Sequence, residues 1–295
     1  MKEAIRVEGL TKAIGGRRIL DGVSFAVQEG EIVGLVGENG AGKSSLLKCL
    51  TGLWRPDAGR VAVFGREIAA GCGYLEETGA LIEYPALFGE YTLAENIELF
   101  SAFCPGGKER AARLVSRLGL EEGMRRKVGT FSSGMKQKAC LVAVLMRSPR
   151  LLILDEPTAG LDPYQRVEIR NLIAGMSLNR IILIATHVVQ DVEVISKEII
   201  LIKEGRLVKT GSSFDLCREL EGHIFEAAVP AEEVESIKQC YRIYGIKELN
   251  SQQLCVRLFS DKKPDNMEVR IAAPTLEDVY LYELGGKSDE KPGQS

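Results

Sequence analysis

Residues 37–44, GENGAGKS, have the glycines, lysine and hydroxyl that binding a nucleoside triphosphate requires. They follow an apolar strand pattern and precede a helix pattern, which is the context that this P-loop motif needs. The glycines let the backbone wrap a phosphate, so that N–H groups and the positive end of the helix face the anion. Lys43 is expected to neutralise the β- and γ-phosphates, and the Ser44 hydroxyl to bind Mg²⁺. The alternative is a glycine-rich surface turn beside a lone lysine.

A second stretch, LLILDEP at residues 151–157, places two carboxylates directly after a predicted buried strand. Ligands of open α/β sheets bind at the carboxyl ends of the strands. Asp155 would hold Mg²⁺ through water, and Glu156 would accept a proton from an attacking water or orient it. The alternative, a strand that ends in a solvated acidic turn, loses weight because a P-loop is present.

Two further polar residues follow these strands. His187, in ATH at residues 185–187, closes the next predicted strand and is expected to contact the γ-phosphate. The alternative is a capping histidine without a catalytic role. Asp162 precedes Pro163, and this pair predicts an N-cap followed by a proline at the first helical position.

The stretch FSSGM, residues 131–135, opens a predicted buried helix with small polar residues. Ser132, Ser133 and Gly134 expose backbone in the way a phosphate-binding helix start does, although no other phosphate motif lies nearby in the sequence. A plain N-cap by Ser132 or Ser133 is the alternative.

The elements that must position these residues alternate between strand and helix. Apolar runs at residues 151–155, 181–186 and 199–205, separated by helix patterns, predict a parallel sheet with crossover helices. The first 30 residues favour antiparallel strands around a Gly15–Gly16 turn. Residues 85–149 are helical in pattern and include a capping box, TLAE.

Composition narrows the function classes. The formal net charge of -3 does not indicate a nucleic-acid partner. The seven cysteines form no CxxC pair, so reduced thiols are expected rather than a disulfide framework or a zinc site. No apolar run reaches the roughly 18 residues of a membrane span, and the start lacks the apolar core of a signal peptide. A membrane role would therefore need a partner.

The motifs GENGAGKSS, FSSGMKQK, LLILDEPTAGLDP and ATH, in this order and spacing, resemble the ATPase subunit of an ABC transporter. The resemblance covers about residues 1–220. It implies an α/β fold, the P-loop NTPase ABC cassette, with a RecA-like parallel-sheet core, an antiparallel β-subdomain and a helical subdomain. It also implies ATP and Mg²⁺ as ligands. The residues expected to bind ATP are Gly37, Glu38, Asn39, Gly40, Ala41, Gly42, Lys43, Ser44 and Ser45.

In that family two cassettes meet head to tail, and the signature motif of one chain covers the ATP of the other. The resemblance therefore implies a homodimer in which Ser132, Ser133 and Gly134 bind the partner's γ-phosphate. Asp162 falls in the family's D-loop, Glu156 and His187 become catalytic residues, and Lys43 supports them. The family's Q-loop glutamine aligns with Glu83, which is assigned to catalysis and to Mg²⁺ together with Ser44 and Asp155.

The sequence departs from the family pattern at three places. Ser133 and Met135 replace a glycine and a glutamine of the signature, while its Ser-x-Gly backbone is kept. Ile14 stands where an aromatic residue often stacks on adenine, which predicts modest ATP affinity and weak purine discrimination. Glu83, in place of the Q-loop glutamine, adds negative charge beside the γ-phosphate. The pair Glu76–Glu77 is an alternative alignment for the Q-loop position. The alternative role for Glu83 is that of a solvated loop carboxylate.

Three parts are expected along the chain. Residues 1–220 form the ATPase domain, with the helical subdomain at about 85–149. Residues 223–284 form a small C-terminal α+β appendage to which no site is assigned. Residues 285–295 are predicted to be a disordered tail.

The stretches around the signature and at the C-terminus resemble ATPases of drug and peptide-antibiotic exporters, including those for lantibiotics and bacitracin. That branch implies separate transmembrane permease subunits, and a cytoplasmic chain at the inner face of the membrane. The alternatives are a soluble ABC-type ATPase acting on nucleic acid or the ribosome, and a P-loop kinase. The first lacks its usual long insertion or second cassette here, and the second leaves the signature motif unexplained.

Overall fold

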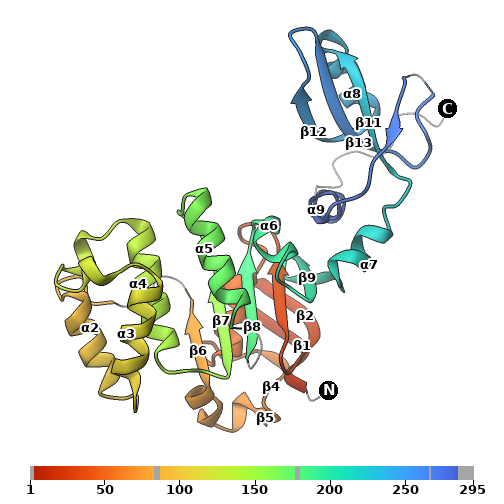
Figure 1. Ribbon diagram of the computed structural model, residues 1–295. Coiled ribbons are helices and arrows are strands. Elements are labelled where there is room, and N and C mark those ends of the chain that lie inside the picture. Colours follow the sequence, from red (N-terminus) through yellow and green to blue (C-terminus); the bar gives the residue numbers. More distant parts are fainter. Residues whose placement is uncertain (1–2, 83–86, 177–179, 266, 285–295) are drawn as a thin grey trace. The chain divides into compact units, whose positions relative to one another are not determined.

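The computed structural model describes residues 3–82, 87–176, 180–265 and 267–284. The chain divides into two compact units, an N-terminal unit, Met1–Thr210, and a C-terminal unit, Gly211–Ser295 (Figure 1). This division falls before helix α7 (Ser213–Arg218), whereas the sequence-based boundary falls just after it. The helix packs against the last helix of the C-terminal unit, α9 (Leu276–Leu284), which explains the earlier division.

A six-stranded sheet of order β10-β9-β3-β8-β7-β6 forms the centre of the N-terminal unit. The pairs β9–β3, β3–β8, β8–β7 and β7–β6 are parallel. Every residue of β3, β7 and β8 is buried, as expected for apolar strands covered on both faces. The strands are β3 (Ile32–Val36), β6 (Thr78–Leu81), β7 (Leu151–Asp155), β8 (Ile181–Thr186), β9 (Glu198–Lys203) and β10 (Arg206–Gly211).

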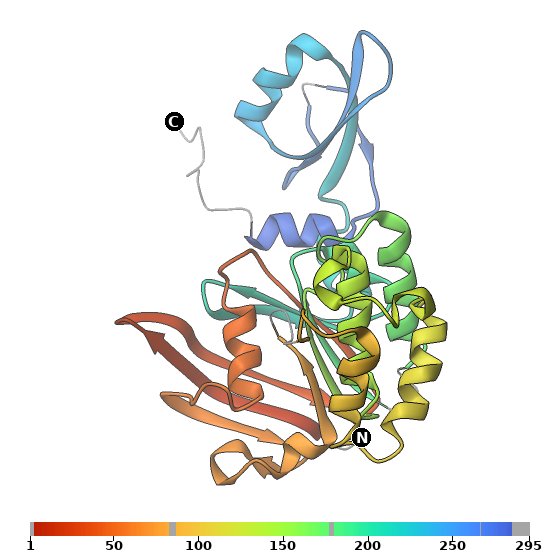
Figure 2. The ribbon, with the colours of Figure 1, turned by 90° about the vertical axis from the view of Figure 1, so that its left-hand side faces the viewer.

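A second sheet, of order β2-β1-β4-β5, is antiparallel where β1 pairs with β2 and β4. Its strands are β1 (Glu3–Ile14), β2 (Arg17–Gln28), β4 (Ala58–Val63) and β5 (Arg66–Glu67). The β1–β2 hairpin turns at Gly15 and Gly16, both with positive φ, which suits glycine in a tight hairpin. This turn places Ile14 directly opposite Arg17. Figure 2 shows these red and orange strands as a layer distinct from the parallel strands.

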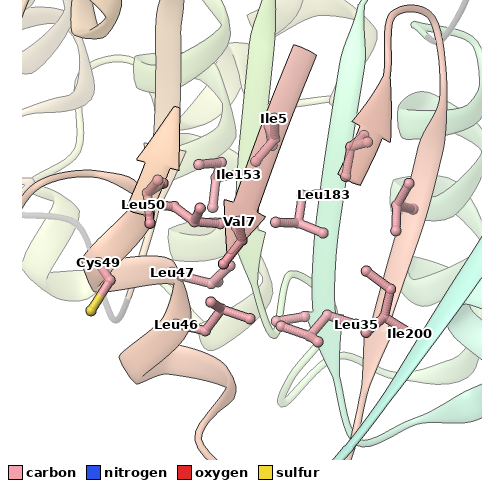
Figure 3. Packing of buried hydrophobic residues seen from close by; sticks show 14 of the residues in the cluster. Ile5, Val7, Leu35, Leu46, Leu47, Cys49, Leu50, Ile153, Leu183 and Ile200 are labelled. Carbon is pink, nitrogen blue, oxygen red and sulfur yellow. The ribbon is translucent and has the colours of Figure 1, made fainter. Parts of the chain in front are cut away.

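Helix α1 (Lys43–Leu50) fills the space between the two sheets. Figure 3 shows Leu46, Leu47 and Leu50 of this helix among side chains from both sheets, such as Val7 of β1 and Leu183 of β8. These residues are fully buried, so the helix that carries the P-loop lysine is anchored by the main core of the molecule.

The α-helices that the structure describes between β6 and β7 are α2 (Leu93–Ser101), α3 (Gly107–Arg117) and α4 (Ser133–Leu145), which form the helical part (Figure 1). The predicted capping box at the start of α2 is confirmed, because Thr92 accepts a bond from the N–H of Glu95 while the Glu95 carboxylate accepts one from the N–H of Thr92. Two crossover helices follow, α5 (Pro163–Ala174) and α6 (Val189–Glu193).

The C-terminal unit contains a four-stranded sheet of order β12-β13-β11-β14. Helix α8 (Val234–Cys240) packs Val234 and Ile237 against one face of it. On the other face Arg257 binds Asp278 of α9 through two hydrogen bonds of 2.9 and 2.6 Å. The strands are β11 (Ile224–Pro230), β12 (Arg242–Glu248), β13 (Gln253–Phe259) and β14 (Arg270–Ile271). The tail at 285–295 lies outside the described residues. In the described part of the chain, every helix is too short or too polar for a membrane span.

Candidate nucleotide site

The P-loop begins where β3 ends and α1 starts, and two of its glycines are required by close packing. A Cβ on Gly37 would lie 2.4 Å from the carbonyl oxygen of Ile202, and one on Gly42 would lie 2.9 Å from that of Ile19. Gly42 also has a φ of 104°, which other residues rarely adopt. Gly42 is the N-cap of α1 and offers no side chain, so the first N–H groups of the helix receive no side-chain cap.

Lys43 lies buried under this loop, with 5% of its surface exposed. Its Nζ donates hydrogen bonds to the carbonyl oxygens of Gly37 at 2.8 Å and Glu38 at 3.0 Å, and lies 3.6 Å from Oε1 of Glu156. Burial lowers the pKa of Lys43 below its ordinary value, while the carboxylates of Glu156 and Asp155 oppose that shift. Nζ is therefore held at the centre of the loop, where a phosphate would need a cation.

The loop opens into a cavity of about 1290 Å³, which is ample for a small-molecule ligand. It is lined by Arg17, Arg18, Ile19, Asp21, Asn39, Gly40, Gly42, Lys43, Ser44, Ser45, Glu156, Lys203, Glu204, Arg206, Leu207 and Val208. Six of the nine residues expected to bind ATP are in this set, and the other three, Gly37, Glu38 and Ala41, belong to the same loop.

Glu156 and His187 are brought together by the pairing of β7 with β8, in which Asp155 lies opposite Ala185. Oε1 of Glu156 accepts a hydrogen bond from the backbone N–H of His187 at 3.1 Å and lies 2.8 Å from Nδ1 of the same residue. The Thr186 hydroxyl donates to the other carboxylate oxygen at 3.2 Å. Glu156 has a φ of 47°, a left-handed backbone conformation that is uncommon outside glycine.

The donor set at this end of the cavity suits Mg²⁺. Ser44 and Glu156 line the cavity, and Asp155 is buried at the end of β7 with its charge close enough to affect Lys43. All three offer oxygen, the donor atom that Mg²⁺ prefers, and phosphate oxygens and water usually complete its shell. The residues present therefore fit this ion.

The start of α4 has a different environment. Ser132 is its N-cap, and its hydroxyl accepts a bond of 3.3 Å from the N–H of Met135, so the capping role that the sequence left as the alternative exists. Ser132 and Ser133 are exposed, whereas Gly134 is buried beneath Gln165, whose Oε1 would lie 2.4 Å from a Cβ at position 134. None of the three signature residues lines the cavity of the same chain.

The remaining predicted residues divide into three groups. Asp162 is the N-cap of α5, as predicted, because its carboxylate accepts a 2.9 Å bond from the N–H of Gln165. Glu83 lies outside the described residues. Of the alternative pair Glu76–Glu77, Glu77 is engaged by Arg150 at 2.8 Å and neither lines the cavity.

Sequence reasoning missed three arginines, Arg17, Arg18 and Arg206, that line the cavity. Arg18 and Arg206 both bind Asp21, at 2.8 and 2.6 Å. Arg17 lines the cavity too, whereas its cross-strand neighbour Ile14 is 45% exposed and does not. No aromatic residue is among the described residues that line the cavity, and the role expected for position 14 stays a prediction. The two-residue turn at Gly15–Gly16 could have indicated the pairing of residues 14 and 17.

Comparison with known proteins gives a consistent result. Residues 20–159 match the family described as ABC transporter. A lantibiotic transport ATP-binding protein of Streptococcus pyogenes is 35% identical over 69% of this chain and 89% of its own length. A bacitracin transport ATP-binding protein of Bacillus licheniformis is 28% identical over 97% of this chain and 99% of its own. The solved structure of an ATP-binding subunit of an ABC transporter superposes with a TM-score of 0.67, at 29% identity, over 74% of this chain and 93% of that one.

Proposed function

This chain belongs to the family of ABC transporter ATP-binding proteins, and from that premise we propose that it drives export of a drug or peptide antibiotic through separate membrane subunits. It is an ATP-binding subunit and an ATPase. The relatives named for bacitracin and lantibiotic transport and for linearmycin resistance support export of such a compound. They do not favour the alternative of an ATPase acting on nucleic acid.

One observation carries the catalytic part of the proposal: Lys43, Glu156 and His187 meet around a single carboxylate oxygen at the mouth of the P-loop. Glu156 Oε1 lies 3.6 Å from Lys43 Nζ and 2.8 Å from His187 Nδ1. With the ATP phosphates on the start of α1, Lys43 neutralises their charge and Glu156 orients and deprotonates a water. His187 keeps Glu156 in place. Mg²⁺, when held by Ser44 and Asp155, neutralises further phosphate charge.

The proposal requires two copies of the chain. The cavity contains the P-loop side of a nucleotide site, whereas the signature residues of the same chain lie elsewhere. Ser132, Ser133 and Gly134 of one copy would complete the site of the other by binding its γ-phosphate. In this arrangement ATP is bound between the two copies and stabilises the dimer, and loss of the γ-phosphate lets the two copies separate.

The helical part offers a surface for the membrane subunits. Phe103, after α2, is 83% exposed, and Phe88 and Tyr91 are about half exposed. A groove of about 420 Å³ lies beside Phe88 and is lined by Leu87, Gly89, Val128, Gly129, Ser133, Lys136 and Cys140. A surface with exposed aromatic side chains in the helical part would let closure of the pair pull on the membrane subunits at the inner face of the membrane.

The test is to replace Glu156 by glutamine, with Glu204→Gln as the matched control. Both glutamates line the cavity and both have a positive φ, so the two variants change backbone strain and charge alike. We expect the Glu156→Gln variant to bind ATP, to hydrolyse it at least 100-fold more slowly and to form a dimer with ATP in size-exclusion chromatography. The Glu204→Gln variant should turn over ATP normally. A fully active or strictly monomeric Glu156→Gln variant would reject the mechanism.

The transport part needs a separate experiment. Affinity purification of the chain from its native membranes should recover a protein with several membrane spans. Cells that lack the chain should then become sensitive to a drug or peptide antibiotic. Recovery of ribosomes or nucleic acid in place of a membrane protein would contradict the proposed function.

A further inference from the structure

A buried hydrogen bond joins the signature helix to the segment that carries Glu156. Gln137 lies in α4, one turn beyond Ser133, and is 6% exposed. Its Nε2 donates a hydrogen bond of 2.9 Å to the carbonyl oxygen of Pro157, the residue directly after Glu156. The two partners are 20 positions apart in the chain, and both atoms are buried. A bond of this kind is strong in a low-dielectric interior, and neither atom has water as an alternative partner.

The same segment is held from its other side. Thr158 and Asp191 are buried and hydrogen-bonded to each other, and Asp191 lies in α6, just beyond His187. The backbone N–H of Glu156 donates to the carbonyl oxygen of Ala185 at 2.8 Å. Glu156 is therefore fixed between two anchors, one on the β8–α6 side and one on α4.

The first turns of α4 are also packed onto α5. Gln165 of α5 covers Gly134, and Lys138 binds Glu168 of α5 at 2.9 Å. The start of α4, the start of α5 and the Glu156 segment are thus joined by side-chain contacts, and the bond from Gln137 reaches the residue that directly follows Glu156. A shift of α4 would be transmitted to Pro157 because close-packed interiors do not deform gradually.

We propose that Gln137 is a positioning residue that couples the signature turn of each chain to the catalytic carboxylate of the same chain. This inference rests on the proposed function, in which Ser132–Gly134 bind the nucleotide of the other copy. Binding of that γ-phosphate fixes the start of α4, and Gln137 then sets the position of Glu156 for the chain's own ATP. Hydrolysis in each site therefore depends on occupancy of the other, through a route inside each chain.

The test compares two replacements of Gln137 with a neighbouring control. Gln137→Met keeps the length of the side chain and removes the donor. Gln137→Glu keeps the shape and can donate to Pro157 only while its carboxyl group is protonated, which burial favours. Lys138→Met is the control, because it removes a contact of α4 with α5 that does not reach the Glu156 segment. Thermal melts establish that each variant is folded.

We expect Gln137→Met to lower kcat at saturating ATP about tenfold or more, because small displacements of a catalytic group have large kinetic effects. ATP affinity of the dilute chain should stay within about twofold of wild type, and the Hill coefficient for ATP should fall toward one. ATP-dependent dimerisation, measured in a Glu156→Gln background, should persist. Lys138→Met should leave kcat and the Hill coefficient close to wild type.

The pH dependence of Gln137→Glu provides the readout that a purely structural role would not give. Its activity relative to wild type should rise as pH falls from about 8.5 to 6, since protonation restores a donor to Pro157, while the ratio for Gln137→Met stays flat. A wild-type kcat in Gln137→Met, or loss of the dimer in proportion to kcat, would overturn the inference. A failure of Glu156→Gln itself would instead overturn the proposed function, so the two outcomes can be told apart.

Discussion

The starts of α1 and α4 are both proposed to bind a γ-phosphate, yet they are built differently. At α1 the N-cap is Gly42, which has no side chain, and the N–H groups face a large cavity beside buried Lys43. At α4 the N-cap is Ser132, which already accepts a bond from Met135. Neither helix has an acidic residue in its first turn, whereas α2, which no ligand is proposed to approach, carries Glu95 there.

This difference indicates that the starts of α1 and α4 have different roles in binding the nucleotide. The backbone N–H groups at the start of α1 remain available to a ligand. The loop, the lysine and the cavity all belong to one chain, so this part of the site needs no second copy. The start of α4 is stable without a ligand and contributes only when another copy brings a phosphate to it. Absence of acidic residues at both starts is consistent with an anion at each, since a carboxylate there would repel it.

Loss of Lys43 should have the largest effect. In Lys43→Met the buried cation that faces the phosphates disappears, and we expect ATP affinity to fall on the order of 100- to 1000-fold. Equilibrium binding of a fluorescent ATP analogue measures this. If affinity falls less than about tenfold, the α1 site does not depend on its lysine and the contrast with α4 is wrong.

Ser132→Asp separates capping from phosphate binding at α4. Aspartate is as good an N-cap as serine, so the melting temperature should hardly change. Its charge would face the partner's γ-phosphate, and we expect ATP-dependent dimerisation to weaken on the order of 100-fold. Ser132→Asn, an equally good but neutral cap, is the matched control. Sedimentation of both variants in a Glu156→Gln background decides the point, and equal dimerisation would leave Ser132 as a cap only.

The start of α9 provides the opposite case, a helix start used for stability alone. The Asp278 carboxylate accepts bonds from Thr275 and Arg257 and is buried. Burial raises the pKa of Asp278, but the bonds from Arg257 and Thr275 outweigh it, so the pKa lies below its ordinary value. The bonded carboxylate therefore stabilises the C-terminal unit fully above the unfolded-state pKa, and this contribution is lost as pH falls below about 4 toward the folded-state value.

Asp278→Asn should lower the stability of that unit by about 2 kcal/mol at neutral pH. The variant should also lose less stability than wild type between about pH 4 and 2, because the titrating group is gone. Thermal melts followed across this pH range test both statements, while ATP binding serves as the control and should not change. A wild-type pH profile in the variant would assign the acid sensitivity to another group.

The smallest expected effect concerns the base end of the α1 site. Ile14 does not line the cavity but lies opposite Arg17, which does. Ile14→Tyr would extend an aromatic ring from this position, and stacking on adenine should raise ATP affinity about fivefold, or about 1 kcal/mol. Titration with ATP and with ribose triphosphate, which lacks the base, measures the gain, and only ATP should show it. An equal gain for both ligands would mean that the ring acts on the phosphates or on the fold.

Much of the α1 site could be predicted from the sequence because its parts are contiguous. The loop at 37–44 and the acidic pair at 155–156 each follow an apolar strand, and local pattern determines both. The predicted caps Thr92 and Asp162 are confirmed for the same reason, and Ser132 also has the capping role given to it as an alternative.

The features that could not be predicted depend on contacts between segments that are distant in the sequence. The bond from Gln137 to Pro157 joins an ordinary-looking glutamine to a backbone oxygen, and no residue type signals it. Arg206 lines the cavity and lies in β10, a strand in which exposed and partly buried residues alternate. The sequence pattern did not predict β10, and it did not predict β12 either. In the described part of the C-terminal unit no strand ends in a recognisable polar motif, so the sequence predicted its α+β class but assigned it no site.

The left-handed backbone at Glu156 limits what evolution and mutagenesis can place at that position. Any residue with a side chain is strained there by roughly 1–3 kcal/mol, and a β-branched one more so. Valine, isoleucine and threonine are thus disfavoured before chemistry is considered, whereas glycine would relax the chain as it removes the carboxylate. The backbone conformation that places the catalytic carboxylate therefore lowers the stability of the fold. A Glu156→Gly variant should be inactive and should have a higher free energy of unfolding than wild type.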